Sequence, residues 1–201
     1  EIVNKYGHSS SWIPKMLSKN NVDFVNRRVY DGDLGEIDAS DAWIITGSEY
    51  SVYEDISWIN SLKSYVSKLI HNKRYILGIC FGHQILGHCL GAKVKKNPLG
   101  WELGSYKIRL SKEGLNHPLF LGMLDNEIVY ESHQDIVYDI PNSLVPLAYS
   151  DKSNQSFSYD NSVFGVQFHP EFSWEVTRML MDIRIKAGIK VDSCKLDQAP
   201  N

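Results

Sequence analysis

Residues 75–90 read YILGICFGHQILGHCL, and this stretch decides the fold. The apolar run 75–79 is typical of a strand that is buried on both faces. After Gly82 the apolar residues return at helical spacing, so the strand is expected to pass directly into a helix. Cys80 lies at the junction, between Gly78 and Gly82. This pattern is the sulfur counterpart of the Gly-x-Ser-x-Gly turn, which presents a nucleophile at the end of a sheet.

The chemistry of such a turn favours a reactive Cys80. The nucleophile must project from a tight turn, and glycines two residues away on either side leave room for the backbone. The helix dipole and the unpaired amides at the helix N-terminus favour the thiolate form and can also bind an oxyanion. An inert thiol is the better interpretation for Cys89, on the apolar face of the helix, and for Cys194, in a tail without clear periodicity.

Strands and helices alternate through the first ninety residues. Residues 43–45 end at Thr46-Gly47 and, like 75–79, suit a buried strand. A parallel sheet with right-handed crossovers is therefore the economical arrangement. Asp55 is expected to cap the second helix, and Ser173 precedes the last one. The spacing of apolar residues predicts four helices: 12–17, 58–70, 85–90 and 176–183.

The middle third of the chain has a different pattern. Five short β-rich stretches follow one another without a helix between them, separated by Gly, Pro, Asn and Asp: 105–110, 127–131, 144–150, 156–159 and 163–168. These stretches predict an antiparallel extension of the sheet. The expected fold class is therefore α/β, with a mostly parallel, flavodoxin-like central sheet that helices flank and antiparallel strands extend.

A thiol nucleophile needs a base, and usually a third group that fixes the base. The segment VQFHPE at 166–171 offers both, because residues two apart in an extended segment share a face. His169 and Glu171 can then point the same way at the end of a strand. A His-Pro turn with a solvated glutamate is the competing interpretation, and His133, in a polar cluster, is the best rival base. Two histidines on the nucleophile helix are expected to be structural: His83 and His88.

Composition disfavours several classes of protein. With 201 residues, 43% of them hydrophobic and 22% charged, the chain 1–201 is expected to form a single domain that needs no disulfide or metal. The net charge of −3 includes no run of like charges, so neither a nucleic-acid nor a membrane partner is indicated. Three cysteines, none in a Cys-x-x-Cys pair, favour a reducing compartment such as the cytoplasm, and the seven histidines show no zinc-ligand spacing.

Two motifs, in this order and about ninety residues apart, resemble the signatures of the class I glutamine amidotransferase family. They are Gly-Ile-Cys-Phe-Gly-His-Gln at 78–84 and Gln-Phe-His-Pro-Glu at 167–171. The segment 44–48 resembles the family's glycine-rich loop, with a serine in place of one usual glycine. Segments 101–104 and 132–135 are most similar to the amidotransferase domain of GMP synthase and to stand-alone relatives of that branch, which include plant-type γ-glutamyl peptidases.

The resemblance implies cysteine-dependent hydrolysis of the glutamine side-chain amide to glutamate and ammonia through a γ-glutamyl thioester. Cys80, His169 and Glu171 would form the catalytic triad. The resemblance also implies an oxyanion hole made of the amides of Phe81 and of Gly47-Ser48. Substrate contacts would come from four further residues: Gln84, Ser132, His133 and Gln134.

Two other functions remain open at this point. A γ-glutamyl peptidase or hydrolase would keep the chemistry and act on a peptide or an amine conjugate, whereas a binding or regulatory protein would keep only the fold. The ligand is expected to be glutamine or another γ-glutamyl small molecule, and no cofactor is implied. Relative to the family, the chain is expected to lack the first strand and a second domain for ATP. Any synthesis that uses the ammonia would then need a separate synthetase subunit.

Overall fold

The computed structural model describes residues 2–190, so residues 1 and 191–201, with Cys194 and most of the unassigned tail, lie outside the described part. The helices of this part are α1 (Ile2–Tyr6), η1 (Ser9–Ser11), α2 (Trp12–Met16), η2 (Val29–Asp31), α3 (Ser57–His71), α4 (Phe81–Cys89), α5 (Lys112–Leu115), η3 (Pro118–Phe120) and α6 (Trp174–Lys186), where η marks a 3-10 helix. The strands are β1 (Ala42–Ile45), β2 (Tyr75–Ile79), β3 (Lys93–Lys96), β4 (Glu102–Lys107), β5 (Arg109–Leu110), β6 (Ile128–His133), β7 (Asp135–Tyr138), β8 (Val145–Tyr149), β9 (Asn154–Tyr159) and β10 (Val163–Val166).

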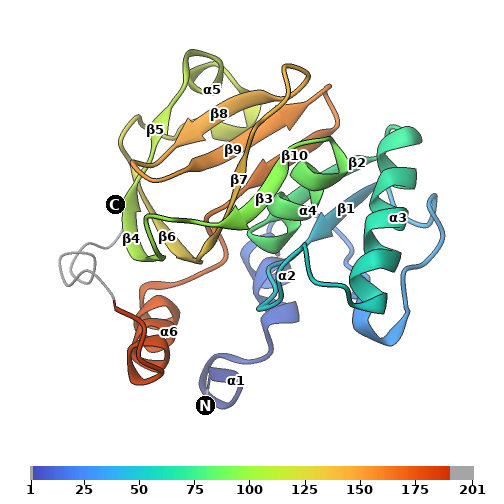
Figure 1. Cartoon of the computed structure of the whole chain (residues 1–201). Coiled ribbons are helices and arrows are strands. Elements are labelled where there is room, and N and C mark those ends of the chain that lie inside the picture. Colours follow the sequence, from blue (N-terminus) through green and yellow to red (C-terminus); the bar gives the residue numbers. More distant parts are fainter. Residues whose placement is uncertain (1, 191–201) are drawn as a thin grey trace.

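A six-stranded sheet runs through the molecule in the order β1-β2-β10-β9-β8-β5 (Figure 1). Both β1 and β10 pair with β2 in parallel, whereas β9, β8 and β5 continue the sheet in antiparallel pairs. The predicted α/β fold, with a parallel core, flanking helices and an antiparallel extension, is confirmed. The parallel pairing brings the carboxyl ends of β1, β2 and β10 to one edge, which is where open α/β sheets place their sites.

Two smaller sheets stand beside the main one, one formed by β4 and β6 and the other by β3 and β7. The stretch 105–110, predicted as one strand, is two strands in different sheets, because β4 ends at Lys107 and β5 begins at Arg109. Neither β3 nor β7 was predicted. β3 reads Lys-Val-Lys-Lys, so it has too few apolar residues to show the alternation of a strand.

The predicted helix caps have different outcomes. Ser173 caps α6, because its Oγ accepts a hydrogen bond from the Val176 N–H at 3.3 Å. The prediction for Asp55 is wrong: the N-cap of α3 is Ile56, which offers no side-chain hydrogen bond, and Asp55 Oδ1 accepts from Asn60 Nδ2 at 2.8 Å. The stability of α3 therefore depends on its apolar stripe, which is buried along the helix: Ile59, Leu62, Tyr65, Val66 and Leu69.

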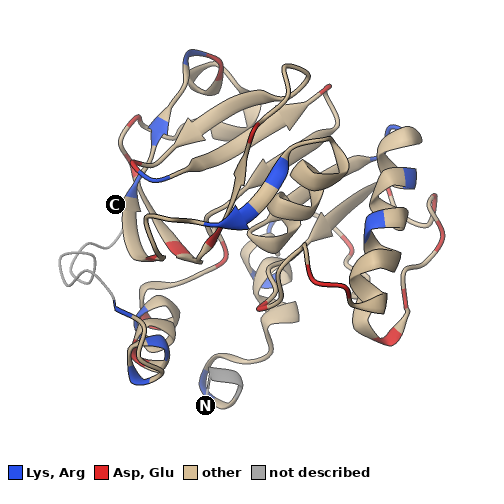
Figure 2. Cartoon of the chain, in the orientation of Figure 1, with Lys and Arg blue, Asp and Glu red and all other residues tan. Residues whose placement is uncertain are grey.

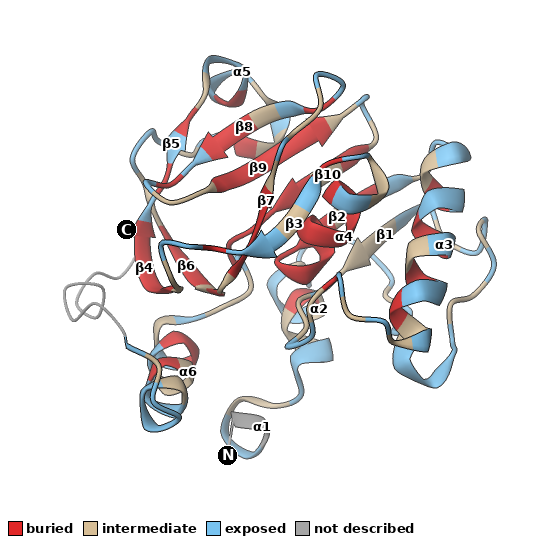
Figure 3. Ribbon diagram, in the orientation of Figure 1, coloured by how far each residue is buried: buried red, intermediate tan, exposed pale blue. Residues whose placement is uncertain are grey.

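Apolar side chains fill both faces of the main sheet, and Figure 3 shows buried residues along β9, β10 and α4. One core cluster joins α3 and α4 to the sheet and contains Ile76 and Phe157. The other joins α2 and η3 to the sheet and contains Ile79 and Leu147. Ile76 and Ile79 lie three residues apart in β2 and so point to opposite faces. Among the helices of residues 2–190, none is long and apolar enough to cross a membrane.

Candidate active site

Cys80 occupies the sharp turn between β2 and α4. Its φ of 54° and ψ of −103° lie outside the conformations that residues with a side chain normally adopt, so the turn is strained. The neighbouring elements hold Cys80 there: its N–H donates to the Val166 carbonyl at 2.9 Å, and its carbonyl accepts from the Gln84 N–H at 3.0 Å. Cys80 is only 5% exposed, so the turn places a buried sulfur at the start of a helix.

The two glycines that flank Cys80 are required by the available space. A Cβ on Gly78 would collide with the backbone carbonyl of Gly82, and a Cβ on Gly82 would collide with the carbonyl oxygen of Ile45. Three backbone segments therefore meet around Cys80 at distances that no larger residue allows. This arrangement confirms the steric reason for the Gly-x-Cys-x-Gly pattern.

His169 follows β10, and its side chain lies beside Cys80, close enough for the sulfur to act on the charge of the imidazole. Its Nδ1 lies 2.8 Å from Glu171 Oε1. Because an ionised carboxylate only accepts hydrogen bonds, Nδ1 carries a proton and Nε2 is the nitrogen that remains for Cys80. Two other contacts hold His169 in place. Its backbone N–H donates to the Tyr130 carbonyl at 2.9 Å, and the Phe172 ring stacks on the imidazole with centroids 3.9 Å apart.

The electrostatics around His169 favour an ion pair between its imidazolium and the Cys80 thiolate. Burial alone would lower the pKa of His169, but the Cys80 thiolate and the Glu171 carboxylate outweigh burial and raise this pKa to about 10. The side chains of His169 and Glu171 are each 7% exposed, so solvent screens their interaction little. Together the three side chains can supply a thiolate, an acid and base, and a carboxylate that orients the imidazole.

The loop after β1 closes the other side of the sulfur. A Cβ on Gly47 would lie 3.0 Å from His169 Cε1 and 3.9 Å from Cys80 Sγ, so a glycine there lets the imidazole and the thiol approach the loop. Ser48 follows and lines the pocket described next. Phe81 is the first residue of α4, so its N–H has no partner within the helix. The start of α4 and the loop of Gly47 therefore both lie next to Cys80, which is where the predicted oxyanion hole would need its donors.

A pocket of about 280 Å³ opens at Cys80. Its wall includes all four residues that were predicted to contact substrate: Gln84, Ser132, His133 and Gln134. Other lining residues were not predicted, among them Glu49, Tyr50, Glu54, Lys96, Trp101 and Arg184. Of these, Trp101 alone belongs to a segment that resembles the family. Lys96 and Arg184 lie in β3 and α6, where the sequence does not distinguish a pocket residue from an ordinary solvent-facing charge.

The side-chain amide nitrogen of Gln84 is already hydrogen-bonded within the protein. Its Nε2 donates to the Asp135 carbonyl and to Gln167 Oε1, both at 3.1 Å. These bonds tie α4 to the first residue of β7 and to the strand end that leads to His169. The side-chain oxygen of Gln84 has no such partner in the described part of the chain, so it is the atom that can accept a hydrogen bond from a ligand.

His133, the rival base, has an acceptor oxygen near each of its ring nitrogens. Nδ1 lies 3.0 Å from the Asp135 carbonyl oxygen, and Nε2 lies 3.1 Å from Glu131 Oε2. No nitrogen is left to take a proton from Cys80, so the geometry favours His169 as the base.

The remaining predicted structural residues lie away from the pocket wall. Burial lowers the pKa of His83 to about 3, and its ring packs against Phe157 in a tilted arrangement with centroids 4.7 Å apart. His88 is exposed on the same helix. Cys89 is partly buried in the core cluster of α3 and α4, and burial raises the pKa of its thiol, as an inert cysteine requires.

The family model described as glutamine amidotransferase class-I matches residues 1–184. The chain is 35% identical over 161 residues to γ-glutamyl peptidase 5 of Arabidopsis thaliana, covering 77% of this chain and 64% of that relative. It is also 35% identical over 138 residues to a glutamine-hydrolysing GMP synthase subunit of Saccharolobus solfataricus, covering 68% of this chain and 70% of that relative.

Solved structures give the same fold. The crystal structure of a glutamine amidotransferase of Thermotoga maritima superposes with a TM-score of 0.78 at 22% identity, covering 92% of this chain and 82% of that one. The chain spans 64% and 65% of the length of two γ-glutamyl peptidases of Arabidopsis thaliana that it matches, numbers 5 and 3.

Proposed function

This chain belongs to the class I glutamine amidotransferase family, and from that premise we propose that it hydrolyses the side-chain amide of glutamine, with Cys80 as the nucleophile. The observation that carries the proposal is the contact of a strained, buried Cys80 with His169, whose Nδ1 lies 2.8 Å from Glu171. A residue is kept in such a conformation only where the surrounding structure enforces it, and such residues cluster at active sites.

In the first half of the reaction, the Cys80 thiolate attacks the amide carbon, and the carbonyl electron pair moves to oxygen. The resulting oxyanion is bound by the Phe81 amide and by an amide of Gly47 or Ser48. When the oxyanion collapses, the carbon–nitrogen bond breaks, and the His169 imidazolium gives its proton to the departing nitrogen. Ammonia leaves, and a γ-glutamyl thioester and a neutral imidazole remain.

In the second half, neutral His169 takes a proton from water as the water oxygen attacks the thioester carbon. The carbon–sulfur bond then breaks, glutamate is released, and the thiolate and imidazolium of the starting enzyme are restored. Glu171 keeps the His169 proton on Nδ1 throughout, so Nε2 always faces the reaction. Removing one oxyanion donor should lower the rate on the order of a hundredfold or more.

The α-amino and α-carboxylate groups of the substrate are assigned to the far wall of the pocket. Gln84 offers its side-chain oxygen, an acceptor suited to an ammonium group. The backbone of Ser132, His133 and Gln134 lines the same wall and can donate to the carboxylate. In this version of the function, a separate synthetase subunit receives the ammonia, as the likeness to a GMP synthase subunit suggests. We place the protein in the cytoplasm, where a free thiol stays reduced.

A second candidate keeps the chemistry and changes the leaving group to the amine of a γ-glutamyl peptide or amine conjugate. Two observations favour it: the 35% identity to a γ-glutamyl peptidase and the extra pocket wall formed by Lys96, Trp101 and Arg184. Ammonia is too small to need that wall, whereas a peptide leaving group would contact it. A binding protein without activity is the third candidate, and the contact between Cys80 and His169 counts against it.

One experiment separates the three functions. Wild-type protein and Cys80→Ser are incubated with glutamine and, separately, with a γ-glutamyl dipeptide, and both ammonia and free glutamate are measured. Glutamate and ammonia from glutamine support the first candidate, whereas glutamate from the dipeptide alone supports the second. Cys80→Ser should be inactive on both substrates. If wild-type protein acts on neither substrate and a glutamine-like electrophile does not label Cys80, the enzyme proposals are wrong.

A further inference from the structure

Two buried glutamates lie on the ribbon formed by β4 and β6, where Figure 2 marks acidic positions in red. Glu102 is directly opposite His133 in this antiparallel pair. Glu131 shares a face with His133, because the two lie two residues apart in β6. Both glutamates are 0% exposed, and His133 is 4% exposed. Carboxylates are so rarely enclosed without a partner that this cluster requires an explanation.

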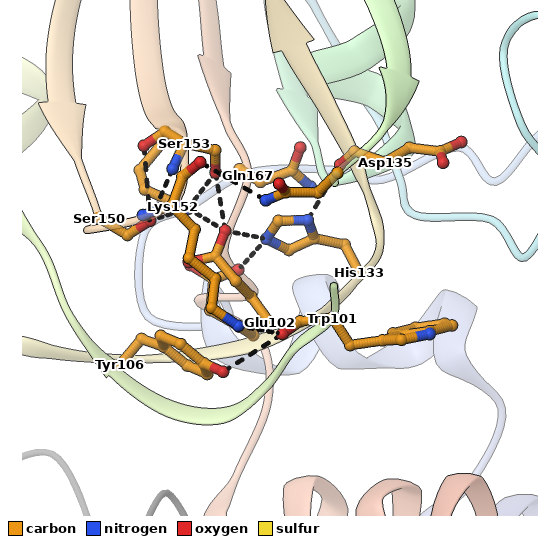
Figure 4. Close-up of polar contacts among 12 residues, drawn as sticks. Trp101, Glu102, Tyr106, His133, Asp135, Ser150, Lys152, Ser153 and Gln167 are labelled. Atoms are coloured by element: carbon orange, nitrogen blue, oxygen red, sulfur yellow. Dashed lines mark hydrogen bonds and ion pairs between the residues drawn. The ribbon is translucent and has the colours of Figure 1, made fainter. Parts of the chain in front are cut away.

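His133 is the group that joins the two glutamates, and Figure 4 shows its imidazole between Glu102 and the backbone of Asp135. Its Nε2 lies 3.1 Å from Glu131 Oε2 and 3.5 Å from Glu102 Oε2. Its Nδ1 lies 3.0 Å from the Asp135 carbonyl oxygen. A carbonyl oxygen only accepts hydrogen bonds, so Nδ1 carries a proton. If the ring were neutral, Nε2 would have no proton, and its lone pair would face two carboxylates. A second proton on Nε2 makes both contacts attractive.

The described part of the chain offers these glutamates no other cation. No Lys or Arg nitrogen of that part lies within 4.0 Å of either carboxylate. Lys152, which borders the cluster, donates to a backbone carbonyl instead, at 2.7 Å. Glu102 Oε2 accepts from the Ser153 hydroxyl at 2.7 Å and from the Gln155 amide at 3.1 Å, and both of these donors are neutral. Within the described residues, His133 is therefore the one side chain beside Glu102 that can carry a positive charge.

We propose that Glu102 and Glu131 keep His133 as an imidazolium, and that this buried cation stabilises negative charge on Cys80. His133 and Cys80 line the same pocket. His169 is the acid and base that exchanges protons during the reaction, whereas His133 is a fixed charge, because both of its nitrogens already face acceptors. The two glutamates are then positioning residues that act through His133. This inference rests on the proposed role of Cys80 as the nucleophile.

The groups that face His133 favour a permanent positive charge on its ring. Burial lowers the pKa of His133, but Glu131, Glu102 and the Cys80 thiolate outweigh burial and raise this pKa to about 9. Burial raises the pKa of Glu131 to about 7, so the cluster can lose its excess negative charge by protonating Glu131 while Glu102 and His133 stay paired. His83, on α4, does not compete as a cation, because burial lowers its pKa to about 3.

Other charged groups of the pocket wall have different surroundings. The carboxylate of Asp135 accepts from the Tyr53 hydroxyl at 3.2 Å, so it faces away from the His133 contacts. Lys96, in β3, is exposed at the edge of the pocket. Neither of these groups replaces the contact of His133 with the two glutamates.

The first test uses the wild-type protein and needs no substitution to fold. Nitrogen-15 spectra of the histidine side chains, recorded from pH 6 to pH 8.5, distinguish an imidazolium from either neutral tautomer. The His133 signals, assigned by their absence in His133→Asn, should show both nitrogens protonated at pH 7.5. A neutral His133 ring at pH 7.5 would overturn the proposal.

The second test measures how fast iodoacetamide alkylates Cys80 as a function of pH. His133→Asn keeps a donor near the Asp135 carbonyl and removes the cation, so the profile should move about one pH unit upward. Well below the midpoint of the wild-type profile this equals roughly tenfold slower alkylation. The double variant Glu102→Gln/Glu131→Gln should move the profile in the same direction. Lys107→Gln, at the exposed end of β4, is the control and should match wild type.

A merely structural role would change stability but leave the pH profile of alkylation in place. Wild-type profiles in both the His133 variant and the double glutamate variant would therefore refute the role of the cation. The outcome is independent of the substrate assays. If the profile moves as expected but neither glutamine nor a γ-glutamyl dipeptide is hydrolysed, the proposed function fails. The stabilisation of negative charge on Cys80 by His133 then still holds.

Discussion

Gly82 lies so close to Ile45 that a Cβ would stand 2.8 Å from the Ile45 carbonyl carbon and would overlap the carbonyl oxygen. This contact joins the first turn of α4 to the end of β1, the two elements whose backbones border Cys80. The position of the sulfur relative to the loop of Gly47 therefore depends on a glycine that makes no contact with substrate.

Gly82→Ala should be costly for this reason. Rigid backbone cannot move out of the way as a flexible side chain can, so we expect a loss of roughly 3 kcal/mol in the free energy of unfolding. Urea unfolding measures this loss. The matched control is Gly122→Ala, where φ is +86° but nothing lies within 4 Å of the added Cβ. There we expect about 1 kcal/mol, the cost of the conformation alone. Equal losses at both sites would refute the steric argument.

Glu171→Gln should impair the reaction more than the fold. The glutamine amide can turn an N–H toward His169 Nδ1, which moves the proton to the nitrogen that should accept from Cys80 or water. We expect kcat to fall by about a hundredfold or more on whichever γ-glutamyl substrate the wild-type protein cleaves. Glu175→Gln, an exposed change four residues further along, should keep kcat within about twofold. A Glu171→Gln enzyme with near wild-type kcat would show that the carboxylate does not orient the imidazole.

The pKa of His169 should respond unequally to its two anionic partners. The thiolate of Cys80 raises this pKa more than Glu171 does, and both act against burial. Because the raised value is about 10, the ring should stay charged from neutral pH until the pH approaches 10 in the wild-type protein. Side-chain nitrogen spectra should show a larger downward shift of the His169 titration in Cys80→Ala than in Glu171→Gln. His88, exposed on α4, serves as an internal reference. The reverse order would mean that Glu171 is the main partner.

The parts of the site that could be predicted from the sequence are those that depend on neighbouring residues. The strand before Cys80, the helix after it and the two glycines form one continuous segment, so their geometry follows from local sterics. His169 and Glu171 are two residues apart, so their shared face also follows from local geometry. Their association with Cys80 required the resemblance between two distant motifs.

The buried charges could not be predicted in the same way. Glu102 and His133 become neighbours only through the pairing of β4 with β6. In the sequence, Glu102 resembles any surface glutamate, and the strand that contains it was predicted to begin at residue 105. The prediction for Asp55 was wrong because the sequence did not fix the start of the helix. α3 begins two residues after Asp55, and the Asp55 side chain accepts a hydrogen bond from Asn60 instead. Side-chain patterns locate elements well and their ends poorly.

His83 should make the protein sensitive to acid. Burial lowers its pKa from the ordinary 6.5 to about 3, so between these values the unfolded chain binds a proton that the native ring does not. The contribution of His83 to stability is therefore fully present above pH 6.5 and is lost as the pH falls toward 3. The shift corresponds to at most on the order of 5 kcal/mol.

Urea unfolding of wild type and His83→Gln between pH 4 and pH 7.5 tests this expectation. The variant loses the contact of the His83 ring with Phe157, so its free energy of unfolding should be lower at every pH. Its decline on acidification should nevertheless be shallower than that of wild type, because the group that takes up the proton on unfolding is gone. His71→Gln, exposed at the end of α3, should keep a slope close to that of wild type. Parallel curves for wild type and His83→Gln would mean that other groups drive the acid transition.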